Sequence, residues 1–378
     1  MQWGREILTE KDNLKKHRAV MVTPGKADSE QLTDVASVDP AAGQVRLKIL
    51  EVGICGTDVE IAKGFYGESP KDHLRLIPGH ESLAAIESLG SGVNHLAEGQ
   101  LVVPIVRRPC LEGCAACVNG RWDLCLSGNY REHGIKALDG FLQEYTVVDA
   151  DAVIPVSPSL RSVAVLVEPL TIVEKAMEEA KAAYPNRWSP AQTALVTGAG
   201  PVGMLAALLL QQHGMEVTIL DQRPVDSPKA QLAGAAGIRY IDDRNTPIEK
   251  MSPPGGYHWI IEATGYSPLL FRAANLLSRN GVLVLTGVTS GHHAVTVDSD
   301  RVNSTLVLEN QTIVGSVNAA RHHYLAAAAD LLDWADRWPG LTQLLITAKY
   351  PLDQFAQAYQ KSSDGIKSVV VMDKGGQE

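Results

Sequence analysis

Residues 194–203 read Ala-Leu-Val-Thr-Gly-Ala-Gly-Pro-Val-Gly, a short apolar run that leads directly into a Gly-x-Gly-x-x-Gly turn. The apolar run is typical of a buried strand, and the apolar segment 204–212 predicts a helix directly after the turn. A second strand expected over 216–220 completes a β-α-β unit, whose two strands must be parallel. Further strands expected over 259–262 and 282–287 continue this alternation. Together they predict a doubly wound parallel sheet.

The turn has the spacing and the context of a dinucleotide-binding fingerprint. Its candidate cofactor-binding residues are Gly198, Gly200, Pro201, Val202 and Gly203. Small residues here allow a tight turn and let a pyrophosphate approach the helix N-terminus, where the helix dipole favours anions. A glycine-rich turn without a nucleotide is the alternative, but Asp221 at the end of the next strand provides the acidic residue that the fingerprint requires.

The type of cofactor depends on the residues after that second strand. Asp221 would accept hydrogen bonds from the adenosine ribose diol and would repel a 2′-phosphate, which favours NAD. Arg223, two positions later, could stack on adenine or pair with a 2′-phosphate. We therefore expect NAD, while NADP or the use of both remains possible.

The sequence before the turn follows a different pattern. Over 19–150, short strands alternate with frequent Gly and Pro turn signals, as in a barrel-like β domain. Within 44–49, Val45, Leu47 and Ile49 alternate with polar residues, which predicts a half-buried strand. Helices are expected over 169–183 and 324–337, and a last strand over 368–372.

Composition excludes two classes of protein. The 378 residues include 34 basic and 43 acidic side chains, a formal charge of −9, whereas a nucleic-acid-binding protein needs a concentrated basic face. Apolar runs such as 204–210 fall far short of the ~20 residues of a membrane span. Residues 1–18 lack the apolar segment of a signal peptide, and we expect a surface extension before a first strand over 19–22. We expect a cytoplasmic protein.

Four of the five cysteines lie close together, at Cys110, Cys114, Cys117 and Cys125. Four thiolates in one short segment can form a closed tetrahedral zinc site. Free surface thiols are one alternative. A redox pair at Cys114-x-x-Cys117 is another, but it lacks a thioredoxin-like context. The spacing therefore favours structural zinc.

A second possible metal site includes the remaining cysteine. Cys55 follows a strand, and His80 and Glu81 occur together in Pro78-Gly-His-Glu81. A thiolate, an imidazole and a carboxylate are the ligands of an open zinc site that keeps one position for water or substrate. Since no cysteine remains, a further ligand should carry oxygen or nitrogen, and Glu168 at the start of the expected helix is the best candidate. A core thiol and a turn histidine are the alternatives for Cys55 and His80 taken singly.

These motifs, in this order, resemble those of the zinc-dependent medium-chain dehydrogenases of the alcohol dehydrogenase superfamily. Segments similar to its glucose 1-dehydrogenase branch are 19–25, 103–108, 134–135 with 140–141, 166–170 and 314–318. The resemblance spans nearly the whole chain after the N-terminal extension. It implies an α/β protein with a β-rich GroES-like catalytic domain (1–188 and 319–378) and a Rossmann coenzyme domain (189–318).

The resemblance also implies roles for particular residues. It places catalytic zinc on Cys55, His80 and Glu168, with Glu81 as an alternating or outer ligand. Thr57 matches the hydroxyl that relays the substrate proton. Further positions match residues that hold sugar hydroxyls or the cofactor, namely Glu132, Asn318, Gln222 and Thr264. Two features depart from the pattern of relatives: the first gap between cysteines is three residues instead of two, and Asp221-Gln222 stands where NADP-preferring relatives have small and basic residues.

The implied reaction is oxidation of an aldose, most simply D-glucose, at C1 to the aldonolactone, with hydride transfer to NAD(P). Zinc would act as a Lewis acid on the C1 hydroxyl. Galactose, xylose, a polyol or a secondary alcohol are alternative substrates, and a non-catalytic NAD-binding protein or metal-free reductase is the alternative of another class. By analogy with relatives we expect a homodimer or homotetramer. Surface or capping roles are expected for the other histidines, His213, His258, His292, His293, His322 and His323.

Overall fold

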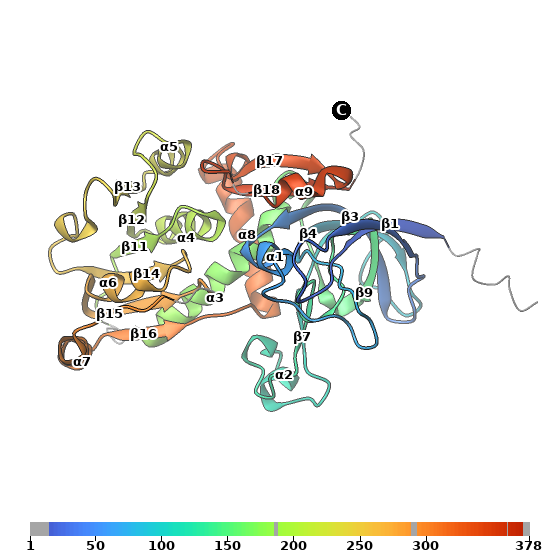
Figure 1. Ribbon diagram of the computed structural model, residues 1–378, viewed down its shortest axis with the longest axis horizontal. Helices are drawn as coiled ribbons and strands as arrows, with labels where there is room; N and C mark the ends of the chain where they lie inside the picture. Colours follow the sequence, from blue (N-terminus) through green and yellow to red (C-terminus); the bar gives the residue numbers. More distant parts are fainter. Residues whose placement is uncertain (1–14, 185–187, 289–292, 361, 373–378) are drawn as a thin grey trace, which may run out of the picture.

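The computed structural model describes residues 15–184, 188–288, 293–360 and 362–372. Two sheets of different character lie on opposite sides of a packed pair of long helices, α3 (Val167–Ala183) and α8 (Arg321–Arg337) (Figure 1). In the described part of the chain, no helix has the length and apolar character needed to cross a bilayer. Residues 1–14 and His292 lie outside the described residues, so the expectations for them have no structural counterpart.

The first sheet is parallel throughout, with the strand order β13-β12-β11-β14-β15-β16. Its strands are β11 (Thr193–Thr197), β12 (Glu216–Asp221), β13 (Arg239–Asp242), β14 (Tyr257–Glu262), β15 (Leu277–Leu285) and β16 (Thr312–Gly315). Its helices are α4 (Pro201–Gln212), α5 (Pro228–Ala235), α6 (Pro268–Ala274) and α7 (Ser299–Leu308). The order reverses between β11 and β14, which is the switch point where such sheets bind ligands. The predicted doubly wound parallel sheet is confirmed.

The glycine-rich turn joins β11 to α4 at this switch point. Gly198 has φ +91°, a conformation that favours glycine, and Gly203 lies so close to the backbone of the turn that a Cβ would be 1.9 Å from the Gly198 carbonyl oxygen. Helix α4 begins at Pro201 and not at 204 as expected. Proline suits the first helical position because its φ is already helical and it needs no backbone donor there.

The second sheet is mostly antiparallel and has the order β10-β5-β4-β3-β18-β17, with β9 also paired to β3. Its strands are β3 (Gln44–Ile54), β4 (Glu81–Leu89), β5 (Leu101–Pro104), β9 (Tyr145–Asp149), β10 (Val153–Pro155), β17 (Ile346–Pro351) and β18 (Lys367–Val371). Strand β18 pairs with β3, so the end of the chain completes a sheet that the N-terminal region begins.

Smaller elements surround this sheet. They are β1 (Lys16–Met21), β2 (Gln31–Ala36), β6 (Arg107–Arg108), β7 (Arg131–His133), β8 (Ala137–Leu138), α1 (Gly56–Ala62), α2 (Ala115–Val118) and α9 (Phe355–Ala358). The segment that holds α2 extends away from the body of the molecule (Figure 1). All strands of the parallel sheet lie within 189–318, and all other strands lie outside it; we keep this division as our proposal for the two domains.

Two further local expectations were wrong. Strand β1 begins at Lys16, so the strand expected over 19–22 starts earlier and takes in part of the presumed extension. Arg46, expected on the polar face of a half-buried strand, is 8% exposed because its guanidinium pairs with Asp39 and Glu87. Paired charge of this kind makes the burial of an arginine tolerable.

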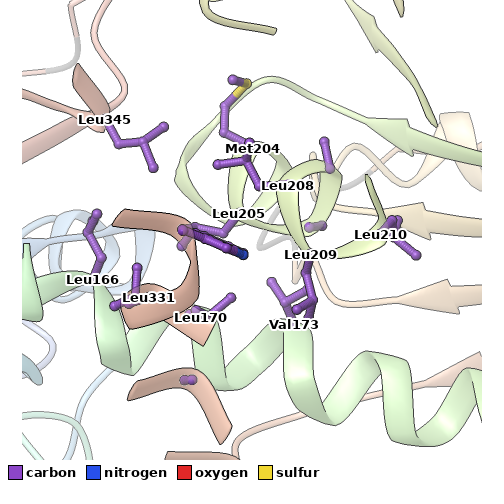
Figure 2. Packing of buried hydrophobic residues seen from close by; sticks show 14 of the residues in the cluster. Leu166, Leu170, Val173, Met204, Leu205, Leu208, Leu209, Leu210, Leu331 and Leu345 are labelled. Carbon is purple, nitrogen blue, oxygen red and sulfur yellow. The ribbon is translucent and has the colours of Figure 1, made fainter. Parts of the chain in front are cut away.

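An apolar core joins the two halves. Figure 2 shows Leu205 and Leu209 of α4 packed toward Leu170 and Val173 of α3, with Leu331 of α8 nearby. All five side chains are at most 1% exposed, and each stabilises the fold by about 1.5–3 kcal/mol. Because α4 carries the glycine-rich turn at its N-terminus, this packing fixes the position of the turn relative to the second sheet.

Candidate active site

Three possible metal ligands meet where β3 ends and β4 begins. Cys55 follows β3, while His80 and Glu81 lie at the start of its antiparallel neighbour β4. Their ligand atoms all lie within 4.8 Å of one another, and Cys55 Sγ is 3.1 Å from His80 Nε2. The opposing residue is Gly53, where a Cβ would lie 2.2 Å from Glu81 Oε2. This donor set of sulfur, nitrogen and oxygen fits the first ligands of an open zinc site.

Asp58 holds this cluster in place, a role that the sequence reasoning missed. Its fully buried carboxylate accepts hydrogen bonds from the backbone N–H of Cys55 (2.9 Å) and of Gly79 (3.2 Å), and lies 3.5 Å from His80 Nδ1. Burial acts to raise the pKa of Asp58, but His80 and the Cys55 N–H lower it below its usual value. A carboxylate behind a histidine orients the ring for metal binding. The available signal was its position three residues after Cys55, where a capping box places an acceptor.

Lys367 of β18 is the second missed residue. Its ammonium group is fully buried, pairs with Glu81 Oε2 and donates to the Ile54 carbonyl oxygen at 3.2 Å. Burial acts to lower the pKa of Lys367, but Glu81 and Cys55 raise it above its usual value. A positive charge is therefore fixed beside the Glu81 carboxylate and the Cys55 sulfur. Its attraction to them offsets part of the free-energy cost of burying these charged groups.

Glu168 and Thr57 lie beside the cluster. Glu168 is 6% exposed, and burial raises its pKa to about 8; His80 acts to lower this pKa and Glu81 to raise it. Its carboxylate is not among the three ligand groups that converge within 4.8 Å, so its role as a ligand stays a prediction. The backbone N–H of Thr57 donates to Cys55 Sγ at 3.2 Å, which helps to stabilise a thiolate.

Glu132 and Asn318, 186 positions apart, are in direct contact. Asn318 Nδ2 donates to Glu132 Oε1 at 2.7 Å, and the same oxygen accepts from Arg107 Nε at 2.9 Å. Asn318 has φ +58°, an unusual backbone conformation for a residue with a side chain, and its own Oδ1 accepts from the Ala319 N–H. Asparagine tolerates this conformation better than most residues do. The structure thus brings together the two residues expected to hold sugar hydroxyls.

The cofactor candidates line two cavities at the switch point. A cavity of about 660 Å³ is lined by Gly198, Asp221, Gln222, Arg223 and Thr264, among others. A second, of about 440 Å³, is lined by Cys55 and Gly56 from one side and by Gly200, Pro201 and Arg223 from the other. Lys229, which the sequence reasoning missed, lines both. Val202 and Gly203, the second and third residues of α4, line neither of these cavities.

Asp221 is oriented by the turn that it faces. Its Oδ2 accepts from the Ala199 N–H at 2.7 Å, and its Oδ1 accepts from the Arg223 N–H at 2.9 Å. Thr264 is held in turn by Glu262, whose Oε1 accepts from the Thr264 N–H at 2.7 Å. A Cβ at Gly200 would meet no heavy atom within 4 Å, which leaves room for a pyrophosphate at the helix N-terminus. These residues fit a dinucleotide.

The four-cysteine segment converges despite its longer first gap. The sulfurs of Cys110, Cys114, Cys117 and Cys125 lie within 4.8 Å of one another, with Cys114 Sγ and Cys125 Sγ 3.9 Å apart. Tetrahedral zinc–sulfur bonds of about 2.3 Å would place sulfurs ~3.8 Å apart. Hydrogen bonds from the backbone N–H groups of Cys117 and Leu126 lower the pKa of Cys114 to about 6, which favours a metal-binding thiolate.

A third convergent group, Glu178 with His322 and His323, has a different chemistry. Glu178 Oε2 lies 2.8 Å from Nε2 of both histidines. His323 Nδ1 accepts from the Ala320 N–H at 3.0 Å, so in the neutral ring Nε2 carries the proton and donates to Glu178. A metal ion would need that nitrogen unprotonated. The geometry therefore makes His323 a cap of helix α8.

Comparisons with known proteins agree with this geometry. A family profile described as glucose dehydrogenase C-terminus matches residues 161–372, and one described as alcohol dehydrogenase GroES-like domain matches residues 41–158. Glucose 1-dehydrogenase of Methanocella arvoryzae is 41% identical over 93% of this chain and 99% of its own length. The enzyme of the same name from Thermoproteus tenax is 43% identical over the same shares.

The structure is similar to that of Haloferax mediterranei glucose dehydrogenase in complex with NADP, Zn and gluconolactone. The TM-score is 0.86 at 28% identity, covering 95% of this chain and 100% of that one. One chain thus contains a GroES-like β domain, a Rossmann sheet, a group of residues that fits an open zinc site and a four-cysteine segment. The chain belongs to the glucose dehydrogenase family of zinc-dependent medium-chain dehydrogenases.

Proposed function

We propose that the protein oxidises an aldose, foremost D-glucose, at C1 and transfers hydride to a nicotinamide dinucleotide. The observation that carries this proposal is the cavity of about 440 Å³ shared by Cys55 of the ligand cluster and Gly200 of the glycine-rich turn. The candidate ligand Cys55 and the cofactor turn therefore line one space. Hydride transfer to the nicotinamide ring, from the carbon that bears the activated hydroxyl, requires this proximity. The names of the relatives at 41% and 43% identity support the choice of sugar.

Cys55 and His80, with Glu168 or Glu81 as the carboxylate ligand, are the residues that would hold catalytic zinc. Zinc bound there supplies Lewis-acid chemistry that lowers the pKa of a hydroxyl. We assign to Thr57 the transfer of the C1 hydroxyl proton toward solvent, because its backbone contacts Cys55 Sγ and its side chain is partly exposed. The C1–H bond breaks with its electron pair passing to the nicotinamide ring while the C1–O double bond of the lactone forms.

Sugar recognition is assigned to Glu132 and Asn318. A carboxylate held by two donors can accept a hydrogen bond from a sugar hydroxyl, and an amide can both donate and accept. This polar pair favours a polyhydroxylated substrate over an apolar alcohol, because an apolar ligand would leave buried polar groups without partners. Galactose differs from glucose in the direction of one hydroxyl group, xylose lacks the hydroxymethyl group, and the activity assay separates the three sugars.

We infer that NAD is the preferred cofactor. Asp221 lies in the wall of the 660 Å³ cavity, and its carboxylate is fixed by two backbone donors. A fixed negative charge there accepts from the ribose diol and repels a 2′-phosphate. Arg223 lines the same cavity and is the residue that would favour NADP. The relative from Haloferax mediterranei was solved with NADP, which makes the direct comparison of the two cofactors informative.

The test is the formation of reduced nicotinamide by the purified protein with D-glucose and either NAD or NADP. We expect faster turnover with NAD, loss of turnover on chelation, and recovery with zinc. His80→Ala should abolish turnover and leave dinucleotide binding intact, whereas His95→Ala, at an exposed histidine, should change neither. Turnover that survives in His80→Ala would contradict the zinc mechanism. Oxidation of galactose, xylose or a polyol without oxidation of glucose would change the substrate and keep the chemistry.

Three further proposals accompany this function. The four cysteines hold a structural zinc, for which metal content of about two zinc ions per chain is the test. The protein forms a homodimer or homotetramer, which its mass in solution would reveal. It acts in the cytoplasm on a small-molecule substrate.

A further inference from the structure

Arg107 is a buried cation that the proposed mechanism does not use. Its side chain is 4% exposed and lies on β6, directly across from Glu132 on β7. The guanidinium group donates through Nε to Glu132 Oε1 at 2.9 Å and through Nη1 to the Asp123 carbonyl oxygen at 3.1 Å. The ring of Tyr130 stacks on it, 3.7 Å from the guanidinium carbon. Two bonds and one stacking contact fix the plane of this group.

Glu132 is thereby held from two sides. One oxygen, Oε1, accepts from Arg107 and also from Asn318, so its position is determined by a strand of the β-rich half and by the segment that follows the Rossmann sheet. No donor contacts the other oxygen, Oε2, within the part of the chain that the structure describes. Charge-assisted bonds of this kind are short and directional, so fixing Oε1 also fixes the direction of Oε2.

The same guanidinium also contacts the four-cysteine segment. This segment is inserted between β6 and β7, and Asp123 belongs to the single helical turn Trp122–Leu124 that precedes Cys125. The Asp123 carboxylate is further anchored by Lys175 of α3 at 3.2 Å and by Arg121 at 2.9 Å. Arg107 is therefore the physical link between the cysteine segment and the carboxylate assigned to the sugar.

We propose that Arg107 is a positioning residue for sugar recognition, which aims Glu132 Oε2 at a substrate hydroxyl and transmits the order of the four-cysteine segment to the sugar site. This inference rests on the proposed function, because it takes Glu132 as a sugar-binding group. Lysine cannot replace arginine here, since a single ammonium group lacks the planar fork that reaches Glu132 and Asp123 together and stacks on Tyr130.

The experiment compares Arg107→Lys with Arg108→Lys in the zinc-loaded enzyme. Arg108 is the neighbouring buried arginine, and it pairs instead with Asp149 and Asp151 at 3.0 Å each. In Arg107→Lys we expect the KM for glucose to rise about tenfold or more, the cost of a misplaced charge-assisted bond, while the KM for the dinucleotide stays unchanged. Arg108→Lys should change neither KM. Calorimetric binding of gluconolactone should weaken by a similar factor in Arg107→Lys only.

A double-mutant cycle with Glu132→Gln shows whether Arg107 acts through Glu132. If it does, Arg107→Lys should add less than about twofold to the glucose KM of Glu132→Gln, because contacting residues are not additive. A further tenfold rise, or an unchanged glucose KM in Arg107→Lys, would overturn the inference. Should Arg107→Lys fail to fold, Arg107→Gln/Glu132→Gln removes both charges together, and its glucose KM must then equal that of Glu132→Gln. Failure of the proposed function itself would show separately, as a wild-type enzyme without sugar oxidation.

Discussion

Substitution of Gly203 by alanine should damage the coenzyme half of the protein before any ligand binds. A Cβ at this position would lie 1.9 Å from the Gly198 carbonyl oxygen and 2.9 Å from its carbonyl carbon. Real Cβ contacts are essentially never shorter than 3.0 Å, so α4 would have to move from β11 by about 1 Å or more. The two atoms that the added Cβ would meet first are backbone atoms of the turn, so no flexible side chain can relieve the clash.

The cost of this displacement follows from the packing of α4. The helix contacts the core through side chains such as Leu205 and Leu209, which are at most 1% exposed. Overpacking typically costs about 1–3 kcal/mol, and a backbone clash belongs at the upper end, near 3 kcal/mol. For a unit of this size, that corresponds to a fall in the midpoint of thermal unfolding of roughly 6–12 °C.

Gly200→Ala is the matched control. Gly200 has φ −79°, and a Cβ there would meet nothing within 4 Å, so the loss of stability should stay below about 1 kcal/mol. The added methyl group would instead occupy the space left for the pyrophosphate. Thermal unfolding, measured without cofactor, reports the loss of stability. Fluorescence titration with the dinucleotide reports the loss of binding. If Gly203→Ala unfolded at the wild-type temperature, the close approach of helix and strand would not constrain this site, and the reasoning would be wrong.

Three further substitutions test buried polar groups. Burial and the neighbouring Asp330 raise the pKa of Glu174 to about 9, so its contribution to stability is lost as the pH rises from its usual pKa through 9. Glu174→Gln should therefore raise the free energy of unfolding, measured by urea denaturation, by on the order of 1–3 kcal/mol at pH 8 and by much less at pH 5. Burial lowers the pKa of His323 to about 4, so its contribution is present above pH 6.5 and is lost as the pH falls toward 4. Between pH 6.5 and 5, the free energy of unfolding should therefore fall less steeply in His323→Gln than in the wild type. An equally steep fall in both proteins would contradict the lowered pKa of His323. Tyr324→Phe removes the hydroxyl that accepts from the buried Val106 N–H at 3.1 Å and should cost about 1–3 kcal/mol in thermal unfolding, whereas no change would mean that the donor finds another partner.

Several features of the fold could be predicted because they depend on neighbours in sequence. The β-α-β unit follows from a strand, a glycine-rich turn and a helix that are contiguous, and the parallel sheet confirms it. Convergence of the four cysteines follows in the same way, since sixteen residues of chain cannot carry them far apart. Errors of a few residues at β1 and α4 arose where hydrogen bonding and proline set the element ends.

The site was predicted less completely, for a physical reason. Cys55, His80 and Glu81 were found because they belong to short motifs whose residue types match metal ligands. Lys367 carries no such motif, and it reaches Glu81 across 286 positions only because β18 pairs with β3. Arg46 was expected to be exposed because alternation does not show where ion pairs compensate the burial of a charge.

The sequence by itself determined the class of the protein: a cofactor turn, two sets of metal-binding residue types and the order in which they occur. These are local, because glycine conformations, capping and ligand spacing act over a few residues. Only the tertiary structure decided that Arg107, Glu132 and Asn318 form one hydrogen-bonded group, and that Cys55 and Gly200 share a cavity. Such contacts join chain segments far apart in sequence, and their geometry is set by the packing of α3, α4 and α8 between the two sheets.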